Sequence, residues 1–173
     1  PDLPIETPEQ QYYANYTVAD SKNRLEWLKQ WVDLKGLVVL EVGSAAGHML
    51  NVLSQEGADV TGIELSQNFV EYSRNLGLRV FDQPITELNF EDEFDLIISF
   101  HCIEHIPDPK KTFQAIQKAL KPVTGMFIGE VPNQNDWRIS IFDNYVVKRF
   151  HYDPYHYYYY SPKTLSAYLA ETG

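Results

Sequence analysis

Residues 37–50, LVVLEVGSAAGHML, constrain the fold of this chain more than any other stretch. They begin with an apolar run containing two β-branched valines, pass through a loop of small residues with two glycines, and resume with residues that favour a helix. This pattern predicts a strand, a tight turn and a helix. Such a turn places backbone N–H groups and a helix N-terminus at the carboxyl end of a buried strand, the edge at which open α/β sheets bind ligands.

Beyond this stretch, short apolar runs alternate with amphipathic segments. Strands that are buried on both faces have nearly continuous apolar sequences, and an amphipathic period of 3.6 indicates the helices between them. The sequence therefore predicts an α/β fold with a doubly wound, mostly parallel sheet. The expected strands are 37–42, 60–63, 78–81, 94–100 and 126–131, and the expected helices are 20–32, 46–55, 66–76, 109–120 and 162–172.

Size and charge exclude several classes of protein. The 173 residues suffice for one domain with a sizeable core but not for two. The net charge of −10 opposes binding to nucleic acid, and no apolar run approaches the roughly 20 residues of a membrane span. A single cysteine, Cys102, fits a protein of the reducing cytoplasm. The N-terminus begins with proline and lacks methionine, which indicates a piece cut from a longer protein.

Two carboxylates end neighbouring predicted strands. Glu41 ends the first, where a buried carboxylate is costly unless it meets a donor, either an ammonium group of a ligand or a loop N–H. Glu64 ends the second, where this topology places a carboxylate that accepts hydrogen bonds from the two ribose hydroxyls of an adenosine; the alternative is an ordinary surface glutamate. The spacing of Gly43 and Gly47 differs from the G-x-G-x-x-G of dinucleotide-binding folds.

Four ordered segments resemble the class I S-adenosylmethionine-dependent methyltransferases, in particular the branch of ubiquinone-biosynthesis O-methyltransferases and related small-molecule enzymes. Each segment is a weak signal alone, but together they follow the order and spacing of that family over about residues 37–133. The segments are VLEVGSAAG at 39–47, VTGIELS at 60–66, FDLIIS at 94–99 with IEHIPDP at 103–109, and LKP at 120–122. The resemblance implies a Rossmann-like methyltransferase fold and S-adenosyl-L-methionine as cofactor.

The resemblance also implies roles for individual residues. The glutamate and glycine loop of 41–47 would hold the methionine end of the cofactor, Glu64 would hold the ribose, and Leu65 would pack on the adenine. Residues 37–131 would be the cofactor-binding core of a single domain over 1–173, preceded by a lead-in and helix and followed by a substrate-side insert and helix over 132–173. The predicted cofactor-binding residues are Glu41, Gly43, Ser44, Ala45, Gly47, His48, Met49, Glu64, Leu65, Phe100 and His101.

Methyl transfer from a sulfonium is an in-line displacement with a good leaving group, so most of the catalysis is positioning. Where an oxygen or nitrogen acceptor also needs a base, His101 and His105 are the candidates; the alternative for His105 is a structural role in its loop. No metal site is predicted, because His151 and His156 lie five positions apart beside Asp153 without a further ligand pattern.

The insert after the fifth predicted strand is rich in aromatic residues. In the resembled family the N-terminal helix and this insert build the acceptor site, which here corresponds to Tyr12–Tyr16 and 132–160. Tyrosines over a pocket suit a planar or apolar acceptor, or shield the sulfonium through cation–π contact, whereas a tyrosine-rich surface equally suits a homodimer contact. The acceptor stays open among a phenol of the quinone type, a sugar, a lipid-linked glycan precursor and a small acid.

Three features depart from the family pattern. Pro84 stands where the family usually has an acidic residue near the adenine amino group, and Asp82 is a substitute two positions earlier. The segment KPVTG at 121–125 replaces the usual KPGG turn. No room remains after Gly173 for the two further strands that complete the family's sheet, so the fifth strand is expected to have an exposed edge.

The leading hypothesis is therefore an S-adenosylmethionine-dependent methyltransferase that acts on a small-molecule acceptor. One alternative is a non-catalytic, methyltransferase-like interaction domain of a larger protein. The other is a nicotinamide-dependent oxidoreductase, and the glycine spacing and the EHIPDP stretch at 104–109 count against it.

Overall fold

The computed structural model describes residues 8–136 and 155–172, with side chains from residue 17 onward. None of the described helices is long and apolar enough to cross a membrane. The strands are β1 (Val38–Val42), β2 (Asp59–Ile63), β3 (Arg79–Phe81), β4 (Leu96–Phe100) and β5 (Met126–Glu130). The helices are α1 (Pro8–Leu28), α2 (His48–Gln55), α3 (Gln67–Asn75), α4 (Pro109–Ala119) and α7 (Pro162–Thr172), with short 3-10 turns η1 (Ile85–Glu87) and η2 (Ile103–His105).

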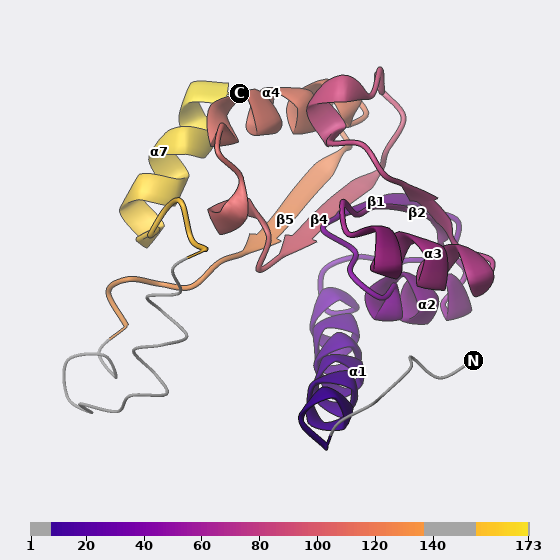
Figure 1. Cartoon of the computed structure of the whole chain (residues 1–173). Coiled ribbons are helices and arrows are strands. Elements are labelled where there is room, and N and C mark those ends of the chain that lie inside the picture. The colour runs from indigo at the N-terminus through magenta and orange to yellow at the C-terminus, as the bar shows by residue number, and fades with distance from the viewer. Residues whose placement is uncertain (1–7, 137–154, 173) are drawn as a thin grey trace.

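The five strands form one parallel sheet in the order β3-β2-β1-β4-β5 (Figure 1). β1 lies in the centre, where Leu40 aligns with Thr61 of β2 on one side and with Ile97 of β4 on the other. The strand order reverses between β1 and β4, and in open α/β sheets ligands bind outside the carboxyl ends of the strands at such a switch point. The predicted doubly wound, parallel sheet is confirmed.

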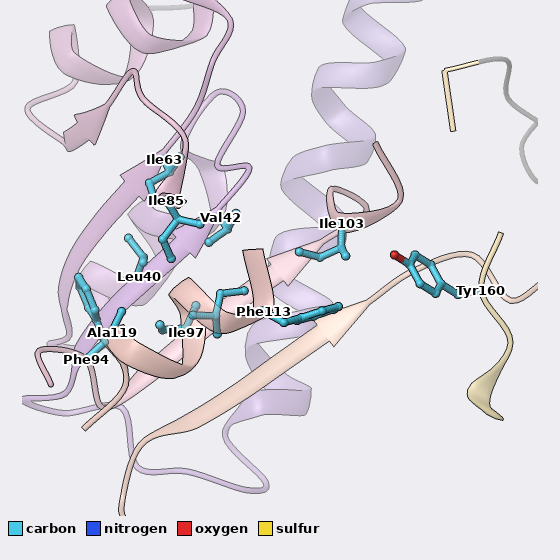
Figure 2. Close-up of a cluster of buried hydrophobic side chains, with 11 residues drawn as sticks. Leu40, Val42, Ile63, Ile85, Phe94, Ile97, Ile103, Phe113, Ala119 and Tyr160 are labelled. Atoms are coloured by element: carbon cyan, nitrogen blue, oxygen red, sulfur yellow. The ribbon is translucent and has the colours of Figure 1, made fainter. Parts of the chain in front are cut away.

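Helices cover both faces of the sheet because successive strand residues point to opposite sides. On one face, Leu28 of α1 packs in a buried cluster with Val39 of β1 and residues of α2. On the other face, Phe113 of α4 packs in a cluster with Leu40, and Tyr160, just before α7, joins this cluster (Figure 2). In Figure 1, α4 and α7 accordingly lie together along one side of the sheet, while α1 and α2 lie on the other.

The first helix differs from its prediction at both ends. The apolar pattern indicated a helix over 20–32 after a lead-in over 1–10, but α1 runs from Pro8 to Leu28. Its first turns are polar and carry no apolar period, so local propensity extends the helix without any pattern that marks it. After Leu28 the N–H groups of Trp31 and Val32 both donate to the Leu28 carbonyl, and this turn ends the helix. Residues 1–7 lie outside the described part.

β5 is an edge strand within the described residues, because it pairs only with β4. Met126, its first residue, is 44% exposed, which agrees with the predicted open edge. The chain returns to the carboxyl end of β5 through an isolated parallel bridge between Asn133 and Tyr160. Most of the predicted substrate-side insert, residues 137–154, lies outside the described residues, as do the side chains of Tyr12–Tyr16.

Candidate functional site

The loop between β1 and α2 lies at the switch point of the sheet. The N–H of Gly43 donates to the carbonyl oxygen of Ile63 at 2.8 Å, which ties the loop to the end of β2. Gly43, Ala45 and Gly47 all have a left-handed backbone, with φ of +83°, +43° and +75°. A left-handed conformation at a residue other than glycine is uncommon and is enriched at functional sites. The left-handed Gly47 also starts α2 at His48, two residues later than predicted.

Side chains from other segments lie close to both glycines of this loop. A Cβ atom on Gly43 would lie 2.5 Å from Sγ of Cys102, and one on Gly47 would lie 2.5 Å from Cδ1 of Leu78. Gly43 therefore sets the distance between the loop and the turn after β4, and Gly47 sets the distance to the segment that enters β3. Glycine at position 43 is therefore a steric requirement of the loop, whereas the neighbour of Gly47 is the flexible end of a leucine side chain.

Glu41 is a buried carboxyl group, and one of its oxygens has no partner among the described residues. The residue is 4% exposed, and its Oε2 has no hydrogen-bond partner in the described part of the chain. Burial raises the pKa of Glu41 to about 8; the Arg24 charge opposes this rise and the Glu64 charge adds to it. A cationic N–H donor would satisfy the oxygen and restore the ionised form. Of the two kinds of donor that the sequence left open, the chain supplies one backbone N–H, that of Leu50, while Oε2 stays without a partner among the described residues.

Glu64 follows β2 and faces the same loop. Its Oε2 accepts the N–H of Ala45 at 2.8 Å, and its Oε1 accepts the N–H of Ser66 at 2.7 Å. Each carboxylate oxygen has a further lone-pair site, so Glu64 can hold the loop and accept ligand hydroxyls at the same time. Leu65 beside it is 60% exposed and presents an apolar surface next to these acceptors.

Two more polar atoms of the predicted set are buried at this loop. Ser44 Oγ and His48 Nε2 both lack a hydrogen-bond partner among the described residues. Burial lowers the pKa of His48, so its ring is neutral near pH 7. Met49, which was also predicted to bind the cofactor, instead packs in the core cluster between α2 and the sheet. The loop therefore holds two buried polar atoms without partners among the described residues, and Met49 packs behind it in the core.

His101, at the carboxyl end of β4, belongs to an ionic network. Its Nε2 lies 2.9 Å from Oε1 of Glu130, and its Nδ1 lies 3.5 Å from Oε1 of Glu104. Two N–H groups of Arg24 donate to the carboxylate oxygens of Glu130, each at 3.1 Å. The Arg24 guanidinium also lies 4.5 Å from the ring centroid of Phe100. One network thus joins α1, the end of β4 and the end of β5.

This network sets the charge of His101. Burial alone would lower the pKa of His101, but the neighbouring carboxylates of Glu104 and Glu130 outweigh it and raise the pKa to about 9. The hydrogen bond from His101, together with those from Arg24, lowers the pKa of Glu130 to about 2 against the effect of burial. His101 is therefore an imidazolium near neutral pH, with no lone pair for a proton. The arrangement suits His101 to donate a hydrogen bond rather than to act as the predicted base.

His105, the other predicted base, joins two segments of backbone. Its Nδ1 lies 3.0 Å from the carbonyl oxygen of Tyr155, and its ring centroid lies 4.6 Å from that of His156. These contacts hold η2 against the segment 155–160. They favour the structural alternative for His105 over the catalytic one.

Three site residues were missed by the sequence analysis: Arg24, Glu104 and Glu130. Glu130 carried a signal, because it ends a strand at the same edge of the sheet as Glu41 and Glu64. Arg24 carried none for this site, since Glu130 is 106 positions away and its other partner, Asp20, lies on the same helix.

The family departures have structural explanations. Asp82 is paired with Arg74 at 3.3 Å, so its carboxylate already has a cationic partner. The KPVTG segment forms a turn in which the N–H of Gly125 donates to the carbonyl oxygen of Lys121 at 2.9 Å. The Nζ of Lys121 in turn binds both carboxylate oxygens of Asp95, at 2.8 and 2.9 Å. The segment is a turn variant, as predicted.

The ion pair of His101 and Glu130 is expected to make stability depend on pH. With the pKa of His101 raised from 6.5 to about 9, its contribution is full below 6.5 and is lost as the pH rises through about 9. With the pKa of Glu130 lowered from 4.5 to about 2, its contribution is full above 4.5 and is lost as the pH falls through about 2. The stability difference between wild type and Glu130→Gln should therefore be largest between pH 4.5 and 6.5.

Urea unfolding at pH 5.5 and pH 9.5 measures this difference. The control is Glu171→Gln, which removes a carboxylate from the exposed ion pair with Lys110. That change should alter stability little at either pH, because exposed pairs contribute roughly 0–1 kcal/mol. An equal loss in Glu130→Gln at both pH values would rule out the charged pair.

Comparison with known proteins identifies the family. A family model described as a methyltransferase domain matches residues 11–173, nearly the whole chain. The chain belongs to this methyltransferase family. Among curated proteins, this chain is 30% identical over 119 residues to a ubiquinone biosynthesis O-methyltransferase of Coxiella burnetii. The match covers 65% of this chain and 50% of that relative. The chain spans about half the length of the curated relatives it matches.

Solved structures agree on the fold of the methyltransferase domain. An S-adenosylmethionine-dependent methyltransferase from Archaeoglobus fulgidus matches with a TM-score of 0.73 at 19% identity, over 92% of this chain and 68% of that chain. The magnesium protoporphyrin IX methyltransferase of Synechocystis PCC 6803, solved with its cofactor, matches with a TM-score of 0.66 at 16% identity, over 100% of this chain and 76% of that chain. The Rossmann-like methyltransferase fold and the class I resemblance are both confirmed.

Proposed function

We propose that this chain is an S-adenosylmethionine-dependent methyltransferase that acts on a small-molecule acceptor. The observation that carries the proposal is the position of Glu41 and Glu64 at one glycine loop: the first keeps a buried oxygen without a partner, and the second accepts two N–H groups with lone pairs to spare. An ammonium group and a pair of vicinal hydroxyls are the complementary donors. S-adenosylmethionine carries both, and membership of the methyltransferase family supports this choice of ligand.

The residues at the loop fit the cofactor in a definite order. Glu41 and the loop 43–47 would hold the methionine end, Glu64 the ribose, and exposed Leu65 the adenine. When bound, S-adenosylmethionine supplies an electrophilic methyl group on a sulfonium. Because that leaving group is good, the work of the surrounding residues is to orient the acceptor and to exclude water.

His101 contributes a fixed positive charge to the acceptor side. Arg24 holds Glu130, and Glu130 holds the ring of His101 at 2.9 Å, so the position of the imidazolium is fixed from two elements. Such a charge attracts an acceptor oxygen without removing its proton. We infer that the acceptor is one that needs no histidine base, such as a hydroxyl that is already acidic or a carboxylate.

Calorimetric titration with S-adenosylhomocysteine tests the proposal. We expect binding in the micromolar range, no binding of reduced nicotinamide dinucleotide, and weaker S-adenosylhomocysteine binding by Glu41→Gln, which cannot ionise. Lack of S-adenosylhomocysteine binding by the folded chain would contradict the proposal. A transfer assay with labelled S-adenosylmethionine and phenols, sugars and small acids then tests turnover. Binding without transfer to any acceptor would favour a non-catalytic interaction domain.

Further inferences concern where the chain acts and on what kind of acceptor. The single cysteine, Cys102, is consistent with a reducing cytoplasm, and the net charge of −10 supports a small-molecule acceptor over nucleic acid.

Self-association through the tyrosine-rich segment is supported by Tyr155 and Tyr157, which are 78% and 64% exposed. Sedimentation of the chain measures the association, and a monomer at all concentrations would contradict it.

A further inference from the structure

The turn after β4 and the tyrosine-rich segment bring three metal-ligating side chains together. Glu104, His105 and His156 each place one ligand atom within 4.8 Å of the other two. Glu104 and His105 belong to η2, whereas His156 comes from the segment that precedes α7. The backbone ties the same two segments, because the N–H groups of Tyr157 and Tyr158 donate to the carbonyl oxygen of Glu104 at 2.9 and 3.2 Å. The cluster therefore lies between two segments that are already fixed to each other.

Glu104 gives the strongest reason to expect a cation here. It is 1% exposed, and both of its carboxylate oxygens are buried without a hydrogen-bond partner in the described part of the chain. The ring of His101 balances the charge of one of these oxygens, since its Nδ1 lies 3.5 Å from Oε1 of Glu104. The remaining oxygen is a costly group in an apolar environment unless a cation meets it. On the other side of the cluster, Nδ1 of His156 is also buried without a partner among the described residues.

His105 is oriented as metal-binding histidines usually are. Its Nδ1 lies 3.0 Å from the carbonyl oxygen of Tyr155. A carbonyl oxygen can only accept, so Nδ1 is the donor and Nε2 is the nitrogen left to ligate a metal. A backbone carbonyl that fixes the ring in this way is the common partner of a histidine that ligates a metal through its other nitrogen.

We propose that Glu104, His105 and His156 bind a divalent transition metal ion, with zinc as the best match. Two imidazoles and one carboxylate are ligands that zinc prefers, whereas magnesium and calcium prefer sites made of oxygen atoms. Ligand atoms around a tetrahedral zinc ion lie about 3.3 Å apart, so movements on the order of 1 Å close the site. Three protein ligands leave a fourth position for water or for an oxygen of the acceptor.

This site escaped the sequence analysis because sequence spacing paired His156 with His151. The fold pairs it instead with two residues about 50 positions earlier, as the contact of His105 with the neighbouring Tyr155 shows. The proposed site does not depend on cofactor binding, since none of its three ligands belongs to the glycine loop.

Calorimetric titration of the EDTA-treated 173-residue chain with zinc tests the proposal. We expect one zinc ion per chain, no binding of magnesium, and a rise in the melting temperature on adding zinc. His105→Ala and His156→Ala should each weaken zinc binding by at least the roughly 10- to 100-fold that loss of an outer-shell partner costs. His48→Gln, which removes another partly buried histidine, should bind zinc as wild type does.

Failure of wild type to bind zinc, or equal zinc binding by wild type and His156→Ala, would overturn the proposal. Equal losses in His156→Ala and His48→Gln would also overturn it, because they would indicate scattered binding to histidines. Glu104→Gln completes the set, and if it does not fold, His156→Ala decides the question, since its ring is only partly buried. S-adenosylhomocysteine binding by His156→Ala should be unchanged, which separates this site from the cofactor pocket.

Discussion

Replacing Glu64 by alanine is expected to weaken binding of S-adenosylhomocysteine by about 2–4 kcal/mol, because hydrogen bonds to a charged acceptor contribute roughly 1.5–3 kcal/mol each and water replaces part of the loss. That is about a 30- to 1,000-fold rise in the dissociation constant. The structure adds a second cause. Glu64 also holds the N–H groups of Ala45 and Ser66, so the variant loses an anchor of the glycine loop before any ligand arrives.

Two variants separate these causes, with calorimetry as the measurement. Glu64→Gln keeps one acceptor oxygen and should lose less affinity than Glu64→Ala. Glu71→Ala removes a carboxylate from the exposed surface of α3 and should bind as wild type does. A folded Glu64→Ala protein with an unchanged dissociation constant would show that Glu64 does not contact the ribose.

Gly43→Ala is expected to destabilise the fold by about 2–5 kcal/mol, or roughly 5–20 °C in melting temperature. The new Cβ would lie 2.5 Å from Sγ and 2.6 Å from Cβ of Cys102, so the loop and the turn after β4 must move apart. The backbone φ of +83° adds the strain of an L-residue in the left-handed region. Thermal unfolding followed by circular dichroism measures the loss.

Gly77→Ala is a closely matched control for this clash. Gly77 has the same φ of +83°, but a Cβ there would meet nothing within 4 Å. Gly77→Ala should therefore lose only the stability that the backbone strain costs, about 1–2 kcal/mol. Adding Cys102→Gly to Gly43→Ala removes both clashing atoms and should restore part of the stability. If Gly43→Ala and Gly77→Ala lose the same amount, steric contact with Cys102 is not what requires glycine at position 43.

The sheet was predictable because its signals are local. Each strand is a short apolar run. The continuous run of β4 predicts a strand buried on both faces, and its residues Leu96–Ile98 are almost fully buried. The positions of Glu41 and Glu64 followed as well, because a residue at the end of a strand lies at the carboxyl edge whatever the rest of the chain does. The polar start of α1 escaped, since it has no apolar face to mark it.

The ionic network was not predictable, because it depends on contacts between distant parts of the chain. Arg24, His101 and Glu130 come from a helix and two strand ends, and no local spacing links them. Their meeting also reverses the expected chemistry. An isolated histidine titrates near neutral pH and suits a base, whereas two flanking carboxylates raise the pKa of His101 to about 9 and make it a donor.

The central place of β1 has a consequence for synthesis of the chain on the ribosome. β1 and β2 can pair soon after both emerge, but the other side of β1 stays open until β4 is made, and the contact of Ser99 with the Val42 carbonyl spans 57 positions. Until then the glycine loop lacks its contact with Cys102, so a nascent chain carries the loop without this support. Long-range parallel pairing of this kind slows folding and leaves an apolar strand edge open to chaperones meanwhile.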